Sequence, residues 1–219
     1  MSGRGSKSYR DFSLDSVQPI RTLYEQLNLP IENQLVSIGL SVWKQPFLDL
    51  DFRQYAFKFT QGLIHGNTVV SHFADVDRKC TFCKIVSKSN FITENDREPT
   101  DQEWELMKDA IQDENRPHIL WDCAIVQQCT KNVFHALWGI REVEKQEFFI
   151  GKLASSHELS LLFQISNMLI RQKIWNYKLA GILPKYGVIA NTVQDVLGRI
   201  CMKPDWRGFL PRLRLLITA

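Results

Sequence analysis

Hydrophobic residues along this chain recur mainly at intervals of three and four, the spacing of one face of an α-helix. The pattern predicts a core helix over residues 51–64, with Asp51 as its N-cap and Gly66 beyond its end. The basic residues Arg53 and Lys58 occupy other positions of this helix. Its apolar face consists of Phe52, Tyr55, Ala56, Phe59 and Leu63.

The longest helical pattern lies in the C-terminal third of the chain. Ser155 or Ser156 is its candidate N-cap, and Gly181 and Pro184 end it. Its apolar stripe consists of Leu159, Leu162, Ile165, Leu169 and Ile174. The charge of this helix comes from Arg171, Lys173 and Lys178.

Caps and stop signals predict the remaining helices. Thr100 and Glu103 have the spacing of a capping box, which opens a helix near residues 101–113. Further helices are expected over residues 13–28, 31–45, 68–73 and 192–202. Because no convincing run of alternating polar and apolar residues is present, the expected fold class is mainly α.

The composition is that of an ordinary globular protein, with 44% hydrophobic and 23% charged residues among 219. Apolar runs are shorter than the ~18 residues that cross a bilayer, and the N-terminal region has no secretory apolar core. We therefore expect an intracellular protein, nuclear or cytoplasmic, without membrane contact. Five cysteines in such a reducing compartment favour metal binding or plain burial over disulfides.

The net charge of +3 is unevenly distributed. Residues 94–114 contain nine acids and two bases, a local balance of −7, so the rest of the chain carries +10. The last 21 residues contain five bases opposed only by Asp205. Basic ends of this kind suit contact with phosphates, and solvated termini that favour solubility are the alternative.

Two pairs of residues have the spacing of metal ligands. A gap of two residues in the first pair lets a tight turn direct two thiolates at one ion, and a gap of four suits the second. Three thiolates and one imidazole favour Zn²⁺, and four protein ligands make the site structural. Lys79, Lys84 or backbone N–H groups are expected to hydrogen-bond the sulfurs. The candidate ligands are Cys80, Cys83, His118 and Cys123.

The weakness of this prediction is the separation of the pairs, because 34 residues lie between Cys83 and His118. The alternative is a set of buried, reduced cysteines and a surface histidine. His135 is a reserve ligand, whereas Cys129 and Cys201 have no partner pattern and are expected to be core thiols.

The region from Trp43 to Trp138 resembles the zinc-binding region that follows the polymerase in LINE-type non-LTR retrotransposon reverse transcriptases. The similarity is carried by the apolar helix over residues 52–64, by the Cys-Thr-Phe-Cys motif, and by the His-Ile-Leu-Trp-Asp-Cys motif. It implies a small helical domain around a CCHC zinc site that helps the polymerase to grip template RNA and target DNA. The implied ligands are the four residues named above.

Two features depart from that family. Its histidine usually follows the second cysteine closely, so residues 84–117 have the character of an acidic insertion. The chain also lacks a Tyr-x-Asp-Asp motif and other paired aspartates for two magnesium ions, so we expect no polymerase activity. Asp205 follows a proline, as in restriction-like endonucleases of some such elements, but no downstream acidic and lysine partners follow it. We therefore expect a non-enzymatic protein.

The sequence thus predicts a zinc-binding, nucleic-acid-binding module derived from a retrotransposon reverse transcriptase. Its partners would be RNA or DNA and, where present, the polymerase part of a retrotransposon protein. The alternative is a domesticated protein-interaction domain that keeps the zinc and has lost nucleic-acid binding. A third alternative is a nuclease that uses Asp205. The expected phosphate contacts are Arg53, Lys58, Lys79, Lys84, Arg199, Lys203, Arg207, Arg212 and Arg214.

The expected organisation has three parts. Residues 1–12 form a flexible basic N-terminus, residues 13–140 a helical zinc-binding domain with the acidic insertion at 84–117, and residues 141–219 a helical C-terminal segment with a basic tail.

Overall fold

The computed structural model describes residues 24–30, 33–151, 156–209 and 211–213. Within these ranges all regular elements are helical, which confirms the mainly-α fold class, and the one β-type pairing is an isolated antiparallel bridge between Lys79 and Asp113. The helices are α3 (Asn33–Ser41), η1 (Val42–Lys44), α4 (Leu50–Thr60), α5 (Asn67–Val70), α6 (Thr81–Asn95), α7 (Asp101–Ala110), η2 (His118–Asp122), α8 (Ala124–Trp138), α9 (Lys145–Ile150), α10 (His157–Leu179), α11 (Tyr186–Cys201) and η3 (Pro204–Trp206).

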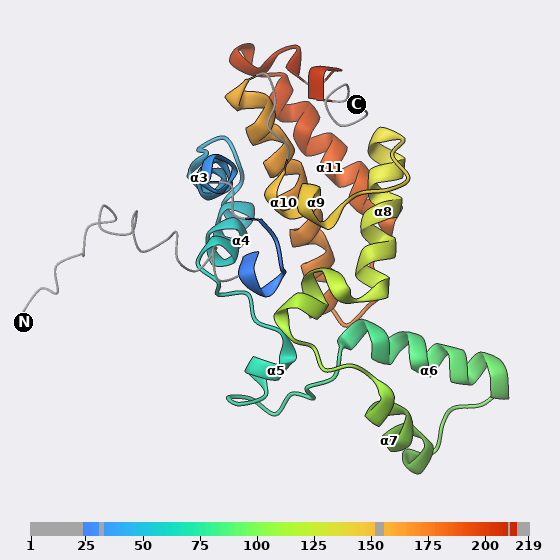
Figure 1. The fold of residues 1–219 in the computed structure, drawn as a ribbon. Helices are drawn as coiled ribbons and strands as arrows, with labels where there is room; N and C mark the ends of the chain where they lie inside the picture. The colour runs from blue at the N-terminus through green and yellow to red at the C-terminus, as the bar shows by residue number, and fades with distance from the viewer. Residues whose placement is uncertain (1–23, 31–32, 152–155, 210, 214–219) are drawn as a thin grey trace, which may run out of the picture.

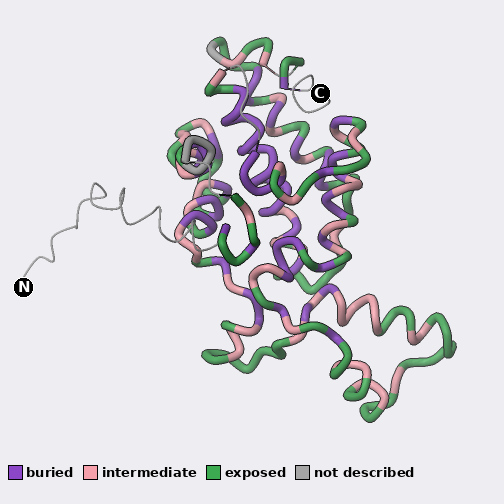
Figure 2. The backbone as a smooth tube through the Cα atoms, in the orientation of Figure 1, coloured by how far each residue is buried: buried purple, intermediate pink, exposed green. Residues whose placement is uncertain are grey.

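Helix α10 runs through the middle of the molecule (Figure 1). It packs against α3, α4, α8, α9 and α11, and Figure 2 shows it as an almost continuously buried segment. Ser156 caps it as predicted, because its side chain accepts a hydrogen bond from the Leu159 N–H at 3.3 Å. The expected single apolar stripe was too narrow a description, since neighbours surround this helix on most sides.

Two basic residues on α10 are buried. Arg171 and Lys178 were assigned to the charge of this helix without a prediction of their burial, and they are only 4% and 9% exposed. The guanidinium of Arg171 lies over the rings of Phe59, Phe148 and Phe149, with its carbon 4.4, 5.4 and 5.2 Å from their centroids. Aromatic faces therefore surround this cation.

Helix α4 forms where the apolar pattern predicts it, but its cap differs. Asp49 caps the helix by accepting a hydrogen bond from the Phe52 N–H at 2.7 Å, and Asp51 lies in the first turn. Leu63, assigned to the apolar face, lies beyond the end of the helix and is 53% exposed.

The helix expected from residue 192 instead begins at Tyr186. The capping box of Thr100 and Glu103 is confirmed at the start of α7.

Helices α6 and α7 project together from the remaining helices (Figure 1). They pack on each other, and most of their residues are exposed or half-buried (Figure 2). Helix α6 was not expected, because no helix was predicted between Cys80 and Thr100. The predicted flexible segment 1–12 and most of the predicted helix 13–28 lie outside the described residues. No helix in the described part of the chain is long and apolar enough to span a membrane.

Candidate metal centre

The structure brings the four predicted ligands together. One donor atom from each of Cys80, Cys83, His118 and Cys123 lies within 4.8 Å of the others. Cys80 and Cys123 are fully buried, His118 is 5% exposed, and Cys83 is half-buried. Residues separated by more than thirty positions thus meet at one point, as a shared ion requires.

The two cysteines of the first pair lie at a helix N-terminus rather than in an isolated tight turn. Cys80 is the N-cap of α6, and Cys83 is the third residue of the helix. Side chains on a helix lean toward its N-terminus, so Cys83 directs its sulfur back toward that of Cys80. The second pair has a related arrangement, because Cys123 is the N-cap of α8 and His118 opens the π-helical turn η2 before it.

Backbone pairing explains how a long intervening segment keeps the ligand pairs together. Helices α6 and α7 leave the centre and return to it through an antiparallel bridge. The Cys80 N–H donates to the Gln112 carbonyl at 3.0 Å, and the Glu114 N–H donates to the Arg78 carbonyl at 2.8 Å. The base of the hairpin is therefore closed next to the first ligand, independently of the length of the helices beyond it.

The distances between donors are compact. Cys80 Sγ and Cys83 Sγ lie 4.0 and 3.7 Å from Cys123 Sγ, and Cys83 Sγ lies 3.6 Å from His118 Nε2. A hydrogen bond from the His118 backbone N–H to Asn115 Oδ1, 2.8 Å long, fixes the start of η2. The Nδ1 atom of His118 is buried without a hydrogen-bond partner, so the polar contacts of the imidazole are made through Nε2.

Hydrogen bonds among the four donors shift pKa values within the cluster. Bonds from Cys80 and Cys83 lower the pKa of the Cys123 thiol, whereas bonds with Cys123 and Cys83 raise the pKa of Cys80 and raise that of His118 to about 10. Both N-cap sulfurs also lie at positive ends of helix dipoles, which favour thiolates. Without an ion, these pKa shifts correspond to a Cys123 thiolate beside a protonated His118 and a neutral Cys80 thiol, so a metal would have to displace protons from His118 and Cys80.

The predicted lysine donors do not contact the sulfurs. Lys79 Nζ pairs with Asp113 Oδ1 at 3.2 Å, and Lys84 Nζ pairs with Asp77 Oδ2 at 3.0 Å. Both side chains turn to nearby carboxylates because these offer a full negative charge within reach. This corrects the expectation that Lys79 or Lys84 would hydrogen-bond the sulfurs.

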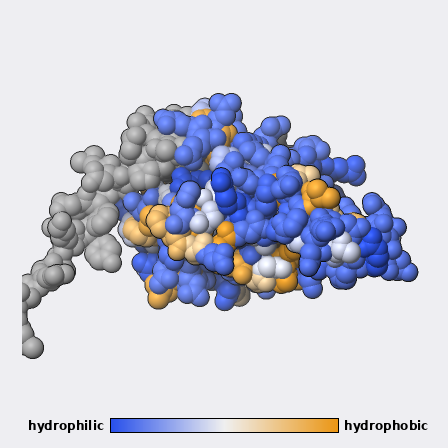
Figure 3. Space-filling model, turned by 90° about the horizontal axis from the view of Figure 1, so that it is seen from below, coloured by the Kyte–Doolittle hydropathy of each residue, from blue (hydrophilic) through white to orange (hydrophobic). Residues whose placement is uncertain are grey.

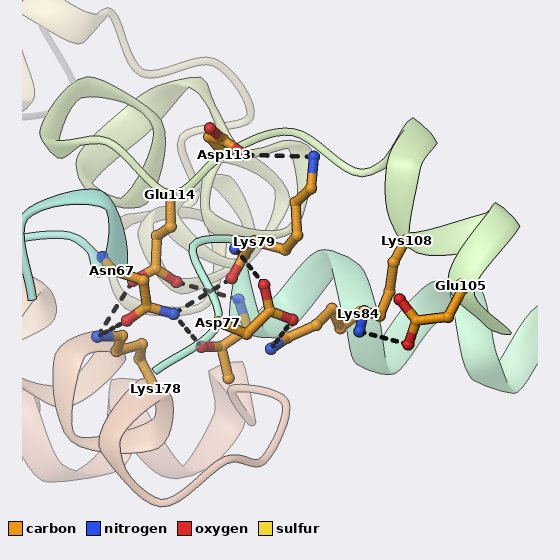
Figure 4. Close-up of polar contacts among 10 residues, drawn as sticks. Asn67, Asp77, Lys79, Lys84, Glu105, Lys108, Asp113, Glu114 and Lys178 are labelled. Atoms are coloured by element: carbon orange, nitrogen blue, oxygen red, sulfur yellow. Dashed lines mark hydrogen bonds and ion pairs between the residues drawn. The ribbon is translucent and has the colours of Figure 1, made fainter. Parts of the chain in front are cut away.

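Sequence reasoning missed Glu114, which is fully buried and contacts the residue that follows Cys80; Figure 4 shows its polar contacts. Its Oε2 accepts a hydrogen bond from the Thr81 N–H at 3.0 Å, and its Oε1 accepts one from the Asn67 N–H at 3.1 Å. Lys178 Nζ forms an ion pair with Oε1 at 3.1 Å. In the sequence this residue ends a run of surface acids, so no local pattern separates it from its exposed neighbours.

The predicted phosphate contacts do not form one surface. Lys79 and Lys84 flank the metal centre, and Arg53 donates through Nε to the Trp43 carbonyl at 3.0 Å. Arg199 and Lys203 line a groove of about 270 Å³ near the C-terminal end of α11, together with Phe47. Exposed side chains also occur at Lys58, Arg207 and Arg212, and Arg214 lies outside the described residues.

The remaining candidate ligands lie away from the cluster. His135 is exposed in the last turn of α8 and does not join the four donors. Cys129 and Cys201 are buried, as expected of core thiols, and burial raises the pKa of Cys129 to about 12. The side chain of Asp205, considered for a nuclease, is not among the described ones.

The cluster has the chemistry of a structural metal centre. Three sulfurs and one imidazole nitrogen could hold one metal ion, and a four-coordinate ion bound by four side chains keeps no position for a substrate.

Comparisons of the chain with models of protein families, with curated proteins and with solved structures find no match.

Proposed function

We propose that this chain is a non-enzymatic, zinc-stabilised helical module that binds nucleic acid. The observation that carries the proposal is the convergence of Cys80, Cys83, His118 and Cys123, whose donor atoms lie within 4.8 Å of one another. Chance burial of reduced cysteines would not bring a histidine and three thiols from two helix N-termini to one point.

The donor spacing supports zinc as the metal. For bonds of about 2.3 Å to sulfur and about 2.1 Å to nitrogen, a tetrahedral site has edges of about 3.8 Å between sulfurs and about 3.6 Å between sulfur and nitrogen. The sulfur pairs lie 3.7 and 4.0 Å apart, and Cys83 Sγ lies 3.6 Å from His118 Nε2. These three distances match the edges of a tetrahedral zinc site, and all four donor atoms lie within 4.8 Å of one another.

The nucleic-acid part of the proposal rests on basic residues at the C-terminal end of α11. Arg199 and Lys203 line a groove with the ring of Phe47, and Lys203 Nζ lies 5.3 Å from the centroid of that ring. Figure 1 shows this end of α11 far from the acidic helix α7. Cations beside an aromatic ring suit phosphates and bases, and the acidic residues of α7 do not cover them, although Asp49 also lines the groove.

The order of the ligands also supports a relationship to the zinc-binding region of LINE-type reverse transcriptases. In that relationship residues 84–117 are an insertion, and the projecting pair of α6 and α7 is consistent with one, because it begins and ends at the same bridge. The module would then act beside a polymerase that this chain does not contain.

Metal analysis of the purified protein tests the first part of the proposal. We expect one zinc per chain, lost in Cys80→Ser and His118→Ala and kept in Cys201→Ser, which changes a thiol outside the cluster. A wild-type protein that holds no zinc after purification in zinc-containing buffer would contradict the proposal.

Binding titrations with a structured RNA and with duplex DNA test the second part. We expect affinity to fall steeply with salt, and the triple variant Arg199→Ala, Lys203→Ala, Arg207→Ala to reduce the slope of log affinity against log salt by about 0.7–0.9 per lost contact. The matched control replaces three bases that are paired with acids, Lys88, Lys131 and Lys145. Absence of association at low salt contradicts nucleic-acid binding.

A second candidate function is protein interaction through the end of the molecule that carries the metal centre. Ion pairs balance the basic residues there, and Figure 3 shows hydrophobic side chains in groups on an otherwise hydrophilic face. Exposed apolar residues include Phe73 and Leu106, which are 87% and 73% exposed. If neither nucleic acid binds, while Phe73→Ser and Leu106→Ser abolish self-association or capture of a partner, this function replaces the first.

A further inference from the structure

A buried ion pair joins the metal centre to the central helix. Lys178 Nζ lies 3.1 Å from Glu114 Oε1, and the two side chains are 8% and 0% exposed. Lys178 lies near the C-terminal end of α10, whereas Glu114 closes the base of the α6–α7 hairpin. Figure 4 shows both side chains converging on Asn67.

Glu114 acts on the first turn of α6, which carries two of the ligands. Cys80 is the N-cap of this helix, but its side chain makes no capping hydrogen bond. The Glu114 carboxylate instead accepts a hydrogen bond from the N–H of Thr81, the next residue, at 3.0 Å. A carboxylate at a helix N-terminus is electrostatically favourable, so Glu114 substitutes for the cap that the metal-directed sulfur does not provide.

Asn67 holds the residues on both sides of Cys80. Its Nδ2 donates to the Lys79 carbonyl at 3.2 Å and to Thr81 Oγ1 at 3.4 Å. Its Oδ1 accepts a hydrogen bond from Lys178 Nζ at 3.0 Å. The lysine therefore orients the amide and the carboxylate at once, and both of these groups fix the backbone around a ligand.

Charge explains why the carboxylate needs a buried cation. Three thiolates around a divalent ion leave a formal charge of about −1, so a second anion nearby is repelled. Lys178 neutralises Glu114, and its Nζ also lies 4.6 Å from the centroid of the Trp175 ring. An unpaired buried charge is strongly unfavourable, so the loss of either partner disturbs the other.

We propose that Glu114 and Lys178 are positioning residues for the metal centre, holding Cys80 and Cys83 in the orientation that the ion requires. The inference rests on the proposed zinc site. Breaking the pair moves the first turn of α6, and this lowers the affinity for the metal and changes the coordination geometry. A pair with only a role in stability would leave the geometry of the loaded site unchanged.

The test uses the full chain and the variants Glu114→Gln, Lys178→Met and their combination. Zinc affinity is measured by competition with a chelator, and the visible absorption of the Co²⁺-loaded protein reports the geometry. We expect each single variant to lower zinc affinity about 10- to 100-fold and to shift the Co²⁺ bands. The double variant is expected to recover part of the affinity, because no unpaired charge remains buried.

Two controls separate positioning from a general loss of stability. Lys178→Arg keeps the cation and is expected to retain most of the affinity. Lys131→Met with Glu142→Gln removes an exposed ion pair and is expected to change neither affinity nor spectrum. If Glu114→Gln does not fold, the comparison of Lys178→Met with Lys178→Arg shows whether the buried cation positions the metal ligands.

The possible outcomes are distinguishable. If the wild-type protein binds zinc, and Lys178→Met binds it with the same affinity and the same Co²⁺ spectrum, the positioning role is overturned while the metal site stands. If the wild-type protein binds no zinc, the proposed function and this inference are both overturned.

Discussion

Lys79 and Asp113 meet through both their backbones and their side chains. They form an isolated antiparallel bridge, and Lys79 Nζ lies 3.2 Å from Asp113 Oδ1. The contact closes the loop between the ligand pairs at its base, next to Cys80. The length of the hairpin beyond the bridge therefore has little influence on how the pairs meet.

An insertion tests this conclusion. Ten glycine and serine residues placed between Glu98 and Pro99, in the connection from α6 to α7, are expected to change zinc affinity less than about threefold. The reason is that lengthening an already closed loop has a small entropic cost. Competition with a chelator provides the measurement. A loss of zinc affinity as large as that caused by Cys83→Ser would show that the bridge does not protect the metal centre from changes in the connection between α6 and α7.

Gly66 packs directly on the backbone of Glu114. A Cβ at this position would lie 2.1 Å from the Glu114 carbonyl oxygen and 2.9 Å from its carbon. Gly66→Ala must therefore displace the segment that carries Glu114, and we expect a loss of about 1–3 kcal/mol in the free energy of unfolding, measured in urea.

The matched control for this substitution is Gly198→Ala in α11, where a Cβ would meet no atom within 4 Å. It is expected to stabilise the protein by about 0.5–1 kcal/mol, because alanine restricts the unfolded chain and favours the helix. Equal effects of the two substitutions would contradict the close approach of Gly66 to Glu114.

Ser156 supplies the cap of the most buried helix. Its hydroxyl accepts the Leu159 N–H, so Ser156→Ala leaves this donor without its partner. We expect a loss of about 1 kcal/mol in the free energy of unfolding, and Ser156→Asp is expected to retain most of the wild-type stability. Urea unfolding followed by circular dichroism checks both values. Identical unfolding of Ser156→Ala and the wild type would count against the cap.

The burial of Tyr24 leads us to predict that the protein loses stability in alkaline solution. Burial raises its pKa from 10.0 to about 12, although Arg171 acts in the opposite direction. The unfolded tyrosine ionises first, so the stability that this group contributes is complete below pH 10 and is lost as the pH rises through about 12. Tyr24→Phe is therefore expected to lose stability less steeply across this window, measured by urea unfolding on either side of it. Parallel pH profiles would contradict the raised pKa.

Removal of the metal is expected to loosen one end of the molecule. In the presence of a chelator, hydrogen exchange should accelerate in α6 and α7, which have few contacts with the central helices apart from the metal centre. Helices α10 and α11 pack on each other and on α8, so they should remain protected longer. Uniform acceleration across all helices would indicate instead that the metal and the core unfold together.

The ligand set could be predicted from the sequence because each pair is local. Cys80 with Cys83, and His118 with Cys123, have spacings that one helical turn or one short turn sets. The meeting of the pairs could not be derived in this way, since it depends on hydrogen bonds around Cys80 and Gln112 that join distant segments. Spacing specifies the donors, whereas the long-range pairing that assembles them leaves no periodic signal.

Buried charges were the main feature that the sequence concealed. Glu114 ends an acidic run, and Arg171 lies beside an apolar stripe, so both have the pattern of surface residues. Their burial depends on groups far along the chain, Lys178 for the carboxylate and the Phe59 ring for the guanidinium. The helices themselves follow local spacing and caps, and for this reason α4, α7 and α10 were predictable.

The burial of α10 limits how the molecule can be shortened. Helices α4 and α8, on the N-terminal side of residue 140, both pack on α10, which follows it in the chain. A fragment that stops at residue 140 would keep every metal donor but leave core side chains such as Phe52 and Val133 without their covering. Such a fragment would aggregate, so anyone who wishes to isolate the metal-binding half must retain the long helix with it.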